Sequence, residues 1–385
     1  MGFEFATANR ILFGRGKVSE AALLAMSMGR HPLLVAASGL DHASVLRTEL
    51  EARGMAPAVF AVSGEPEVST VSDGVRVARD EGCDLVIGLG GGSALDAGKA
   101  VATMMTNEGD VLDYLEVIGR GRSLANAPAP YIAIPTTAGT GTEVTRNAVL
   151  ASSEHGVKVS LRSPQMLPRA AIVDPGLTLS VPPDITANTG LDALTQLIEP
   201  FVCNRPNPLV DGICREGIPR AAAALPRAVE EGDDIQAREE MSLASLFGGM
   251  ALANAGLGAV HGIAAPLGGL THAPHGAVCA RLLPLVMEAN VRALRSRMPG
   301  SPALARYEEV GRLLTGDMAA GADDAVRWTQ SICRRLDIRP LSHYGFTLEG
   351  IPAVAAQAQK ASSMRANPIS LTDEELTEVL TRALA

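Results

Sequence analysis

The chain of 385 residues is long enough for two or three domains at the usual size of about 100–200 residues each. Hydrophobic residues make up 47% and charged residues 19%, which provides a large core and argues against a disordered chain. The formal net charge of −9 disfavours a dedicated nucleic-acid-binding protein, because that class normally carries a basic excess. An acidic surface does not exclude a local site for phosphate.

The five cysteines are scattered and form no CxxC pair. This pattern disfavours a disulfide framework and a cysteine-rich zinc site, and it fits a reducing compartment such as the cytoplasm. The first residues show no basic start followed by an apolar run, and no stretch of about 18 apolar residues occurs. We therefore expect a cytoplasmic protein without a signal peptide or a membrane span.

The first part of the chain alternates between short apolar runs and segments with helical spacing. Continuous apolar runs separated by helical connections are typical of buried parallel strands in an α/β domain. The predicted strands are residues 32–37, 56–62, 83–89, 131–134 and 170–173, and the predicted helices are residues 42–54, 71–81 and 94–105.

Beyond residue 178 the chain has long runs rich in Ala, Leu and Arg with helical period, and no further strand is predicted. The clearest helical runs are residues 184–201, 209–231, 237–255, 302–314 and 323–336. We therefore expect an α/β N-terminal domain, residues 1–178, and an all-α C-terminal domain, residues 179–385.

A glycine-rich loop follows the third predicted strand, in the sequence CDLVIGLGGGSALDAGK of residues 83–99. Such a turn brings backbone N–H groups and a helix N-terminus together, which favours binding of a pyrophosphate. Ser93 stands where the usual dinucleotide fingerprint has its third glycine, so the fingerprint is not clearly present. The alternative is a tight strand–helix turn without a ligand.

A second polar loop, PTTAGTGTE at residues 135–143, follows the next predicted strand. Ligands of open α/β sheets bind at the carboxyl ends of strands, and the hydroxyl groups of this loop suit a ribose or a base edge. A capped turn without a ligand is the alternative.

A possible metal site combines two segments of the C-terminal part. Asp192 and Gln196 are four residues apart on one face of a predicted helix, and His261 and His275 lie in a glycine-rich stretch. A carboxylate and two imidazoles suit a divalent metal, with Gln196 as a neutral oxygen ligand, and His272 could replace one imidazole. The alternative is that these histidines cap or pack and that the carboxylate caps or is solvated.

Four long motifs, in this order along the chain, resemble the iron-containing (group III) alcohol dehydrogenases: GLGGGSALDAGKA, AIPTTAGTGTEVTRNAV, GLDALTQLIEP and VHGIAAPLGGLTHAPHG. The resemblance runs from ILFGRG to DEELTEVLTRAL and so covers nearly the whole chain. It implies an α/β dinucleotide-binding domain and an all-α metal and substrate domain, a fold shared with dehydroquinate synthases. It also implies NAD or NADP, Fe²⁺ or Zn²⁺, a small alcohol or carbonyl substrate, and a homodimer.

The resemblance also assigns residues. It implies that Gly91, Gly92 and Ser93 hold the cofactor pyrophosphate. Further cofactor-binding positions are implied at Asp96, Thr136, Thr137, Asn147 and Lys158. Asp192, His261 and His275 match three of the family's four metal ligands and are the expected catalytic residues, with Gln196 at the fourth ligand position.

Two departures from the family pattern concern the metal and the relay of protons. Gln196 replaces a ligand histidine and is a weaker donor, and Ala265 replaces a second histidine that lies by the nicotinamide in relatives. With a metal bound, we expect it to act as a Lewis acid on the substrate oxygen while the cofactor carries the hydride. The alternative is a metal-independent enzyme like the maleylacetate reductases, in which Gln196, His261 or His275 polarises the carbonyl group.

The cofactor choice and two other function classes stay open. An acidic residue that repels a 2′-phosphate in NAD-specific relatives aligns with Ala37, so that NADP is allowed. A lyase like dehydroquinate synthase would need a basic cluster that the helical part does not show as a pattern. The missing histidines also suit a nucleotide-binding homologue that has lost catalysis.

Overall fold

The computed structural model describes residues 2–39, 41–155, 157–271 and 273–385. The chain divides into two compact units. The α/β unit comprises Thr7–Thr137 and Gly141–Ser180. The helical unit comprises Val181–Ala385, together with Ala138–Thr140 and a short segment that ends at Ala6.

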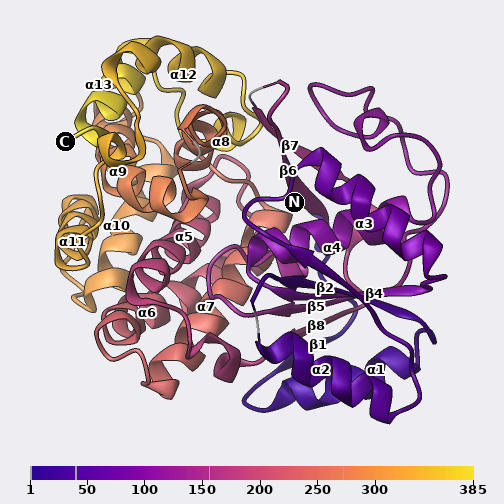
Figure 1. The fold of residues 1–385 in the computed structure, drawn as a ribbon. Helices are drawn as coiled ribbons and strands as arrows, with labels where there is room; N and C mark the ends of the chain where they lie inside the picture. Colours follow the sequence, from indigo (N-terminus) through magenta and orange to yellow (C-terminus); the bar gives the residue numbers. More distant parts are fainter. Residues whose placement is uncertain (1, 40, 156, 272) are drawn as a thin grey trace. The chain divides into compact units, whose positions relative to one another are not determined.

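A six-stranded parallel sheet forms the centre of the α/β unit, with the strand order β1-β8-β5-β4-β2-β3 (Figure 1). Its strands are β1 (Ile11–Phe13), β2 (Pro32–Ala37), β3 (Ala58–Val62), β4 (Leu85–Gly90), β5 (Tyr131–Pro135) and β8 (Ala170–Val173). The five predicted strands are confirmed as β2, β3, β4, β5 and β8. All five are continuous apolar runs, and β2, β4, β5 and β8 are buried on both faces, whereas β3 lies at the edge of the sheet and is partly exposed.

Three strands of the described residues were not predicted from the sequence. Strand β1 has only three residues. Strands β6 (Asn147–Ser152) and β7 (Val157–Arg162) form a separate antiparallel hairpin whose side chains alternate in burial, so that neither is a continuous apolar run. The glycine-rich loop follows β4, the third of the predicted strands, which is the fourth strand of the chain because β1 precedes it.

Helices cover both faces of the sheet. Helices α1 (Ala21–Met26) and α2 (Asp41–Ala52) lie on one face, and α3 (Val68–Asp80) and α4 (Gly92–Met104) lie on the other (Figure 1). The side chains of β2 divide between two core clusters according to the period of two: Leu33 packs with α3 and α4, and Leu34 packs with α1 and α2.

The end of β4 requires glycine. Gly90 has φ of +151°, and a Cβ atom there would lie 2.8 Å from Cβ of Ala94 and 3.1 Å from Cβ of Ala37. The backbone can therefore turn tightly from the strand into α4, which places the N-terminus of that helix at the carboxyl edge of the sheet.

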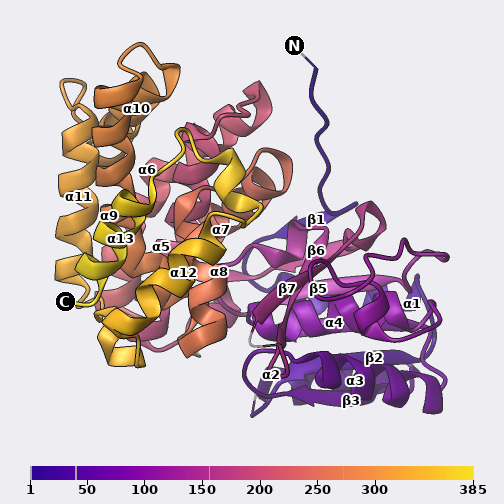
Figure 2. The same ribbon diagram turned by 90° about the horizontal axis from the view of Figure 1, so that it is seen from above.

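The helical unit contains the remaining long helices. They are α5 (Pro183–Val202), α6 (Pro208–Glu230), α7 (Ile235–Asn254), α8 (Ala259–Thr271), α9 (His275–Arg297), α10 (Pro302–Thr315), α11 (Ala322–Arg335), α12 (Ile351–Ala358) and α13 (Asp373–Ala383). Helix α5 is largely buried and packs against α6, α7 and α9 (Figure 2). No strand follows β8 in the described part of the chain, which confirms the predicted fold class of an α/β region followed by an all-α region.

Within the described residues, no single helix has both the length and the apolar composition to cross a membrane. Helices α7 and α8 pass that test only as a pair, and the pair is bent by 95°.

Candidate functional site

Three helices of the helical unit bring four metal-binding side chains together. Asp192 comes from α5, His261 from α8, and both His275 and Cys279 from α9. One donor atom from each residue lies within 4.8 Å of all the others. We call these four residues the metal cluster. Asp192, His261 and Cys279 are buried, whereas the His275 side chain is 36% exposed, so that solvent reaches the cluster at His275.

The carboxylate of Asp192 lies close to both imidazoles of the metal cluster. Its Oδ1 atom lies 3.4 Å from His261 Nε2 and 3.8 Å from His275 Nε2, and it makes no hydrogen bond within the described residues. Three buried side-chain oxygens of the described residues have no hydrogen-bond partner, and two of them are Asp192 Oδ1 and Gln196 Oε1. An unpaired buried carboxylate oxygen is costly unless a cation compensates for it, so this atom points to a metal site.

Burial would raise the pKa of Asp192, but the positive charges of His275 and His261 lower it below the usual value. Burial would lower the pKa of His261, but its neighbours Cys279, Glu199 and Asp192 raise it well above the usual value. Burial and the charge of Asp192 raise the pKa of the Cys279 thiol to about 12. The shifts of Asp192 and His261 favour the charged forms of these side chains, whereas the shift of Cys279 favours the neutral thiol.

Glu199 orients the imidazole of His261 through Nδ1, the ring nitrogen that does not face Asp192. Glu199 Oε2 lies 2.7 Å from His261 Nδ1, and Glu199 Oε1 accepts a hydrogen bond from the backbone N–H of Val260 at 2.7 Å. A carboxylate that accepts from Nδ1 fixes the tautomer in which the Nε2 lone pair faces a metal. The sequence interpretation missed Glu199, although it lies seven residues after Asp192, two turns along the same helix.

Gln196 lies beside the metal cluster but turns its amide nitrogen toward it. Gln196 Nε2 donates to Asp192 Oδ2 at 2.8 Å, whereas Oε1 lies on the side of Gly248, 3.6 Å from the position of a Cβ atom there. The opposite amide orientation would place two oxygens in contact, so the carboxylate selects the observed one. The role of Gln196 as a metal ligand stays a prediction, and His272 lies outside the described residues.

The loops predicted to bind the cofactor lie at the carboxyl edge of the sheet. Strands β4 and β5 are neighbours that pair Gly90 with Pro135, so that the loops after them are adjacent. Thr137 Oγ1 lies 3.4 Å from the position of a Cβ atom at Gly91. Gly91 is the N-cap of α4 and no side chain caps this helix, so Ser93 lies inside the helix and is not its cap. The N-terminus of α4 thus presents backbone N–H groups with Gly92 at its first position, which suits an anion.

Asp96 and Lys99 hold the end of the second loop and the first residues of β6 against α4. Asp96 accepts hydrogen bonds from Thr142 Oγ1 and, at 3.0 Å, from the backbone N–H of Val149. Lys99 Nζ donates to the carbonyl oxygens of Thr142 at 2.7 Å and of Asn147 at 2.8 Å. These contacts position Asn147, and they show that both carboxylate oxygens of Asp96 are engaged within the α/β unit.

Lys158 makes a different contact. Its Nζ atom lies 2.6 Å from Glu65 Oε2, and the Lys158 side chain is largely buried. Thr136 is buried and donates its backbone N–H to the carbonyl of Gly90 at 2.9 Å. The cofactor-binding roles of these residues stay predictions.

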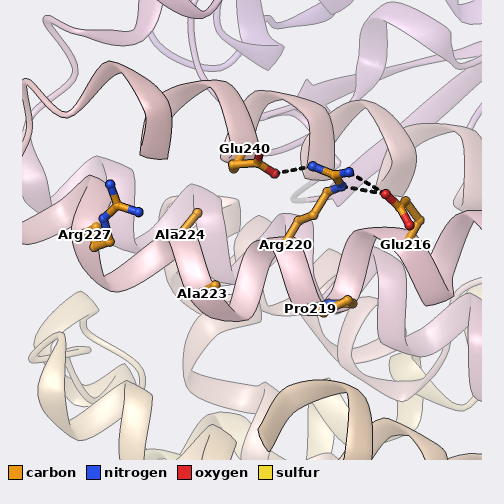
Figure 3. Close-up of a pocket in the computed structure, with 7 residues that line it drawn as sticks. All are labelled: Glu216, Pro219, Arg220, Ala223, Ala224, Arg227 and Glu240. Atoms are coloured by element: carbon orange, nitrogen blue, oxygen red, sulfur yellow. Dashed lines mark hydrogen bonds and ion pairs between the residues drawn. The ribbon is translucent and has the colours of Figure 1, made fainter. Parts of the chain in front are cut away.

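A separate surface depression between α6 and α7 shares no residue with the metal cluster or the loops (Figure 3). Its cavity volume is about 330 Å³, and its lining residues are Glu216, Pro219, Arg220, Ala223, Ala224, Arg227 and Glu240. Arg220 is paired with Glu216 and Glu240, so its charge is already compensated by the protein. The depression offers no arrangement for chemistry.

The contact of Glu199 with His261 leads to a first prediction. In Glu199→Gln, a neutral amide replaces the carboxylate that orients the imidazole, and we expect the affinity for Zn²⁺ or Co²⁺ to fall by about 10–100-fold. The measurement is competition with a chromophoric chelator. Glu216→Gln on α6 is the matched control, because Glu216 is an exposed carboxylate that pairs with Arg220 away from the metal cluster, and its affinity should stay within about twofold of wild type. Equal affinities for the two variants would show that Glu199 has no positioning role.

Comparisons with known proteins identify the family of the chain. The family model "Iron-containing alcohol dehydrogenase" matches residues 8–175, and "Fe-containing alcohol dehydrogenase family, C-terminal" matches residues 186–384. Alcohol dehydrogenase 4 of Saccharomyces cerevisiae is 32% identical over 379 residues, covering 96% of each chain.

Two solved structures have the same fold. A 1,3-propanediol oxidoreductase superposes with a TM-score of 0.92 at 32% identity, covering 100% of both chains. Sulfoacetaldehyde reductase from Bifidobacterium kashiwanohense, in complex with NAD⁺, superposes with a TM-score of 0.88 at 29% identity, covering 100% of this chain and 99% of that one. The chain belongs to the iron-containing alcohol dehydrogenase family and is an oxidoreductase that acts on CH–OH groups.

Proposed function

We propose that this alcohol dehydrogenase uses NAD or NADP to interconvert a small alcohol and its aldehyde or ketone, with a divalent metal as Lewis acid. The observation that carries the metal part is the buried Asp192 oxygen without a hydrogen-bond partner, facing two histidine nitrogens. Support for the cofactor and the substrate class comes from the relatives, one of which is complexed with NAD⁺ and another of which acts on 1,3-propanediol.

The donor set fits a divalent transition metal such as Fe²⁺ or Zn²⁺. Asp192 supplies a carboxylate oxygen, and His261 and His275 supply imidazole nitrogens, a combination that both ions accept. When bound, the metal polarises the substrate oxygen and stabilises the alkoxide. Asp192 supplies a negative charge to the site. Glu199 is hydrogen-bonded to His261 Nδ1, so that this nitrogen does not act as a proton relay. Ala265 supplies no proton at the position where relatives have a histidine.

The α/β unit supplies the proposed cofactor site. Gly91, Gly92 and Ser93 at the N-terminus of α4 would take the pyrophosphate, because uncapped backbone N–H groups and the helix dipole favour an anion. Asp96, Thr136, Thr137, Asn147 and Lys158 are the further cofactor-binding residues that we propose.

The second candidate function is a metal-independent carbonyl reductase. It is favoured by Gln196, whose amide nitrogen rather than its oxygen faces Asp192. In that enzyme His261 or His275 would donate to the carbonyl oxygen directly. The two candidates share the cofactor and differ in their response to chelation.

Turnover tests the proposed function directly. Purified protein is assayed for oxidation of NADH and of NADPH with short aldehydes, hydroxyaldehydes and ketones, and for reduction of NAD⁺ and NADP⁺ with the matching alcohols. We expect turnover with at least one pair in both directions. Absence of any turnover across the panel, with metal supplied, would leave a nucleotide-binding homologue without catalysis.

A second prediction concerns NADP. Ala37 ends β2 beside Gly90, at the position where a carboxylate would repel a 2′-phosphate. We expect Ala37→Asp to raise KM for NADPH by at least about tenfold, which is about 1.4 kcal/mol, with little change for NADH. Ala37→Asn has nearly the same shape without the charge and should raise KM for NADPH much less. If both variants change KM for NADPH equally, charge at this position does not select the cofactor.

A further inference from the structure

Cys279 gives the metal cluster a donor that the sequence motifs did not single out. We propose that the Cys279 thiolate is the fourth protein ligand of the metal, beside Asp192, His261 and His275, and that its sulfur makes the site select Zn²⁺. This inference rests on the proposed function, in which the same cluster binds a divalent metal.

Four of the six distances between donor atoms are close to those of a tetrahedral site. Metal–N and metal–O bonds of about 2.0–2.1 Å and a metal–S bond of about 2.3 Å place N and O donors about 3.4 Å apart and S about 3.6 Å from N. Asp192 Oδ1 lies 3.4 Å from His261 Nε2 and 3.8 Å from His275 Nε2. Cys279 Sγ lies 3.5 Å from His275 Nε2 and 3.9 Å from His261 Nε2. These separations are already close to those that a bound zinc ion requires.

The spacing of His275 and Cys279 in α9 brings their side chains together. His275 and Cys279 are four residues apart in α9, so their side chains project from one face of the helix, one turn apart. Cys279 has no exposed surface, and its sulfur faces the imidazole nitrogens of the cluster. The unpartnered Asp192 Oδ1 is an independent observation at the same place, because a buried anionic oxygen there requires a cation.

Gln196 is the competing fourth ligand, and its orientation argues against that role. Its amide nitrogen is committed to Asp192 Oδ2 at 2.8 Å, which turns Oε1 toward Gly248 in α7. Gln196 therefore holds the second oxygen of Asp192, while Oδ1 remains directed at the cluster. The histidine that the family has at position 196 is thus replaced by a sulfur donor from α9.

A thiolate ligand changes the properties of the site. On metal binding the thiol proton is released to solvent, and the metal–sulfur bond forms without any change of oxidation state. Asp192 and the Cys279 thiolate then supply two negative charges to a dication. Thiolate is a soft donor that favours Zn²⁺ over Mg²⁺ and Mn²⁺, and Zn²⁺ also stands above Fe²⁺ in the general affinity order.

Cobalt substitution tests the proposal with a readout independent of activity. Metal-free full-length protein is titrated with Co²⁺, and we expect a thiolate-to-cobalt charge-transfer band in the near ultraviolet that saturates at about one ion per chain. In Cys279→Ser the band should disappear, and the affinity for Zn²⁺ in chelator competition should fall at least about tenfold. Cys333→Ser is the matched control, because Cys333 is also a buried thiol but bonds only to the Ala280 carbonyl in α9, and it should keep both properties.

The outcomes separate the two proposals. Bound Co²⁺ without the band, or a band that survives in Cys279→Ser, would overturn the thiolate ligand and leave the metal in the proposed function intact. Failure of wild-type protein to bind Co²⁺ or Zn²⁺ at all would overturn both.

One measurement needs no variant and so does not depend on whether Cys279→Ser folds. X-ray absorption at the zinc edge of wild-type protein should show about one sulfur scatterer at about 2.3 Å together with nitrogen and oxygen scatterers at about 2.0–2.1 Å. A shell of nitrogen and oxygen alone would overturn the proposal.

Discussion

Asp192→Asn is expected to lower kcat/KM by about 10³-fold, about 4 kcal/mol, and to abolish stoichiometric metal binding. The substitution keeps the shape of the side chain but removes the negative charge between His261 and His275. A neutral amide also cannot serve as an anionic ligand at the place where Oδ1 now has no hydrogen-bond partner. The measurements are steady-state kinetics with the best substrate and elemental analysis of the purified variant.

Asp323→Asn is the matched control for this variant. Asp323 lies in α11 of the same unit and makes an exposed ion pair with Arg295, so its loss should leave kcat/KM and metal content within about twofold of wild type. Wild-type activity in Asp192→Asn would remove Asp192 from the catalytic site. Lost activity with full metal content would instead assign Asp192 to catalysis without a role in metal retention.

Lys99→Met is expected to lower the free energy of unfolding of the α/β unit by about 3–5 kcal/mol. Lys99 is 1% exposed, and its ammonium group donates hydrogen bonds to Thr142, Thr145 and Asn147. Burial lowers the pKa of Lys99 to about 8, while the charge of Asp96 opposes this shift, so the ammonium is still protonated at pH 7. Methionine fills similar space but leaves the buried oxygens of Thr142, Thr145 and Asn147 without their donor, and Asp96 without its cationic neighbour, which is costly for buried groups.

Urea unfolding at pH 7, followed by circular dichroism and fluorescence, measures this effect. Lys17→Met is the matched control, because Lys17 forms an exposed pair with Glu20 in the same unit and should cost less than about 1 kcal/mol. A loss of stability in Lys99→Met as small as in the control would mean that the loop after β5 is held without the ammonium group.

The sequence predicted the parts of the fold that have one dominant physical signal. Buried parallel strands are apolar on both faces, so β2, β3, β4, β5 and β8 stood out as continuous runs. The hairpin of β6 and β7 did not, because its strands alternate in burial. β1 is three residues long and gains its conformation from pairing with β8, a contact between distant segments that no local pattern contains.

The site was predictable only in part. Asp192, His261 and His275 could be named because their motifs resemble a known family, and the structure brings all three together. Cys279 was set aside with the other scattered cysteines, because its significance depends on the start of α9, which places it one turn after His275. Glu199 was missed for a similar reason, since its partner His261 lies on another helix. Both depend on tertiary packing rather than on spacing alone.

The measurement that tests the metal-dependent mechanism most directly is the metal content of anaerobically purified protein, paired with turnover before and after chelation. We expect about one zinc or iron ion per chain, loss of turnover when the metal is removed, and recovery when about one equivalent of Zn²⁺ or Fe²⁺ is returned. Full turnover in protein that contains only traces of metal would contradict it. In that case Asp192, His261, His275 and Cys279 would not be metal ligands, and the chain would be a metal-independent reductase.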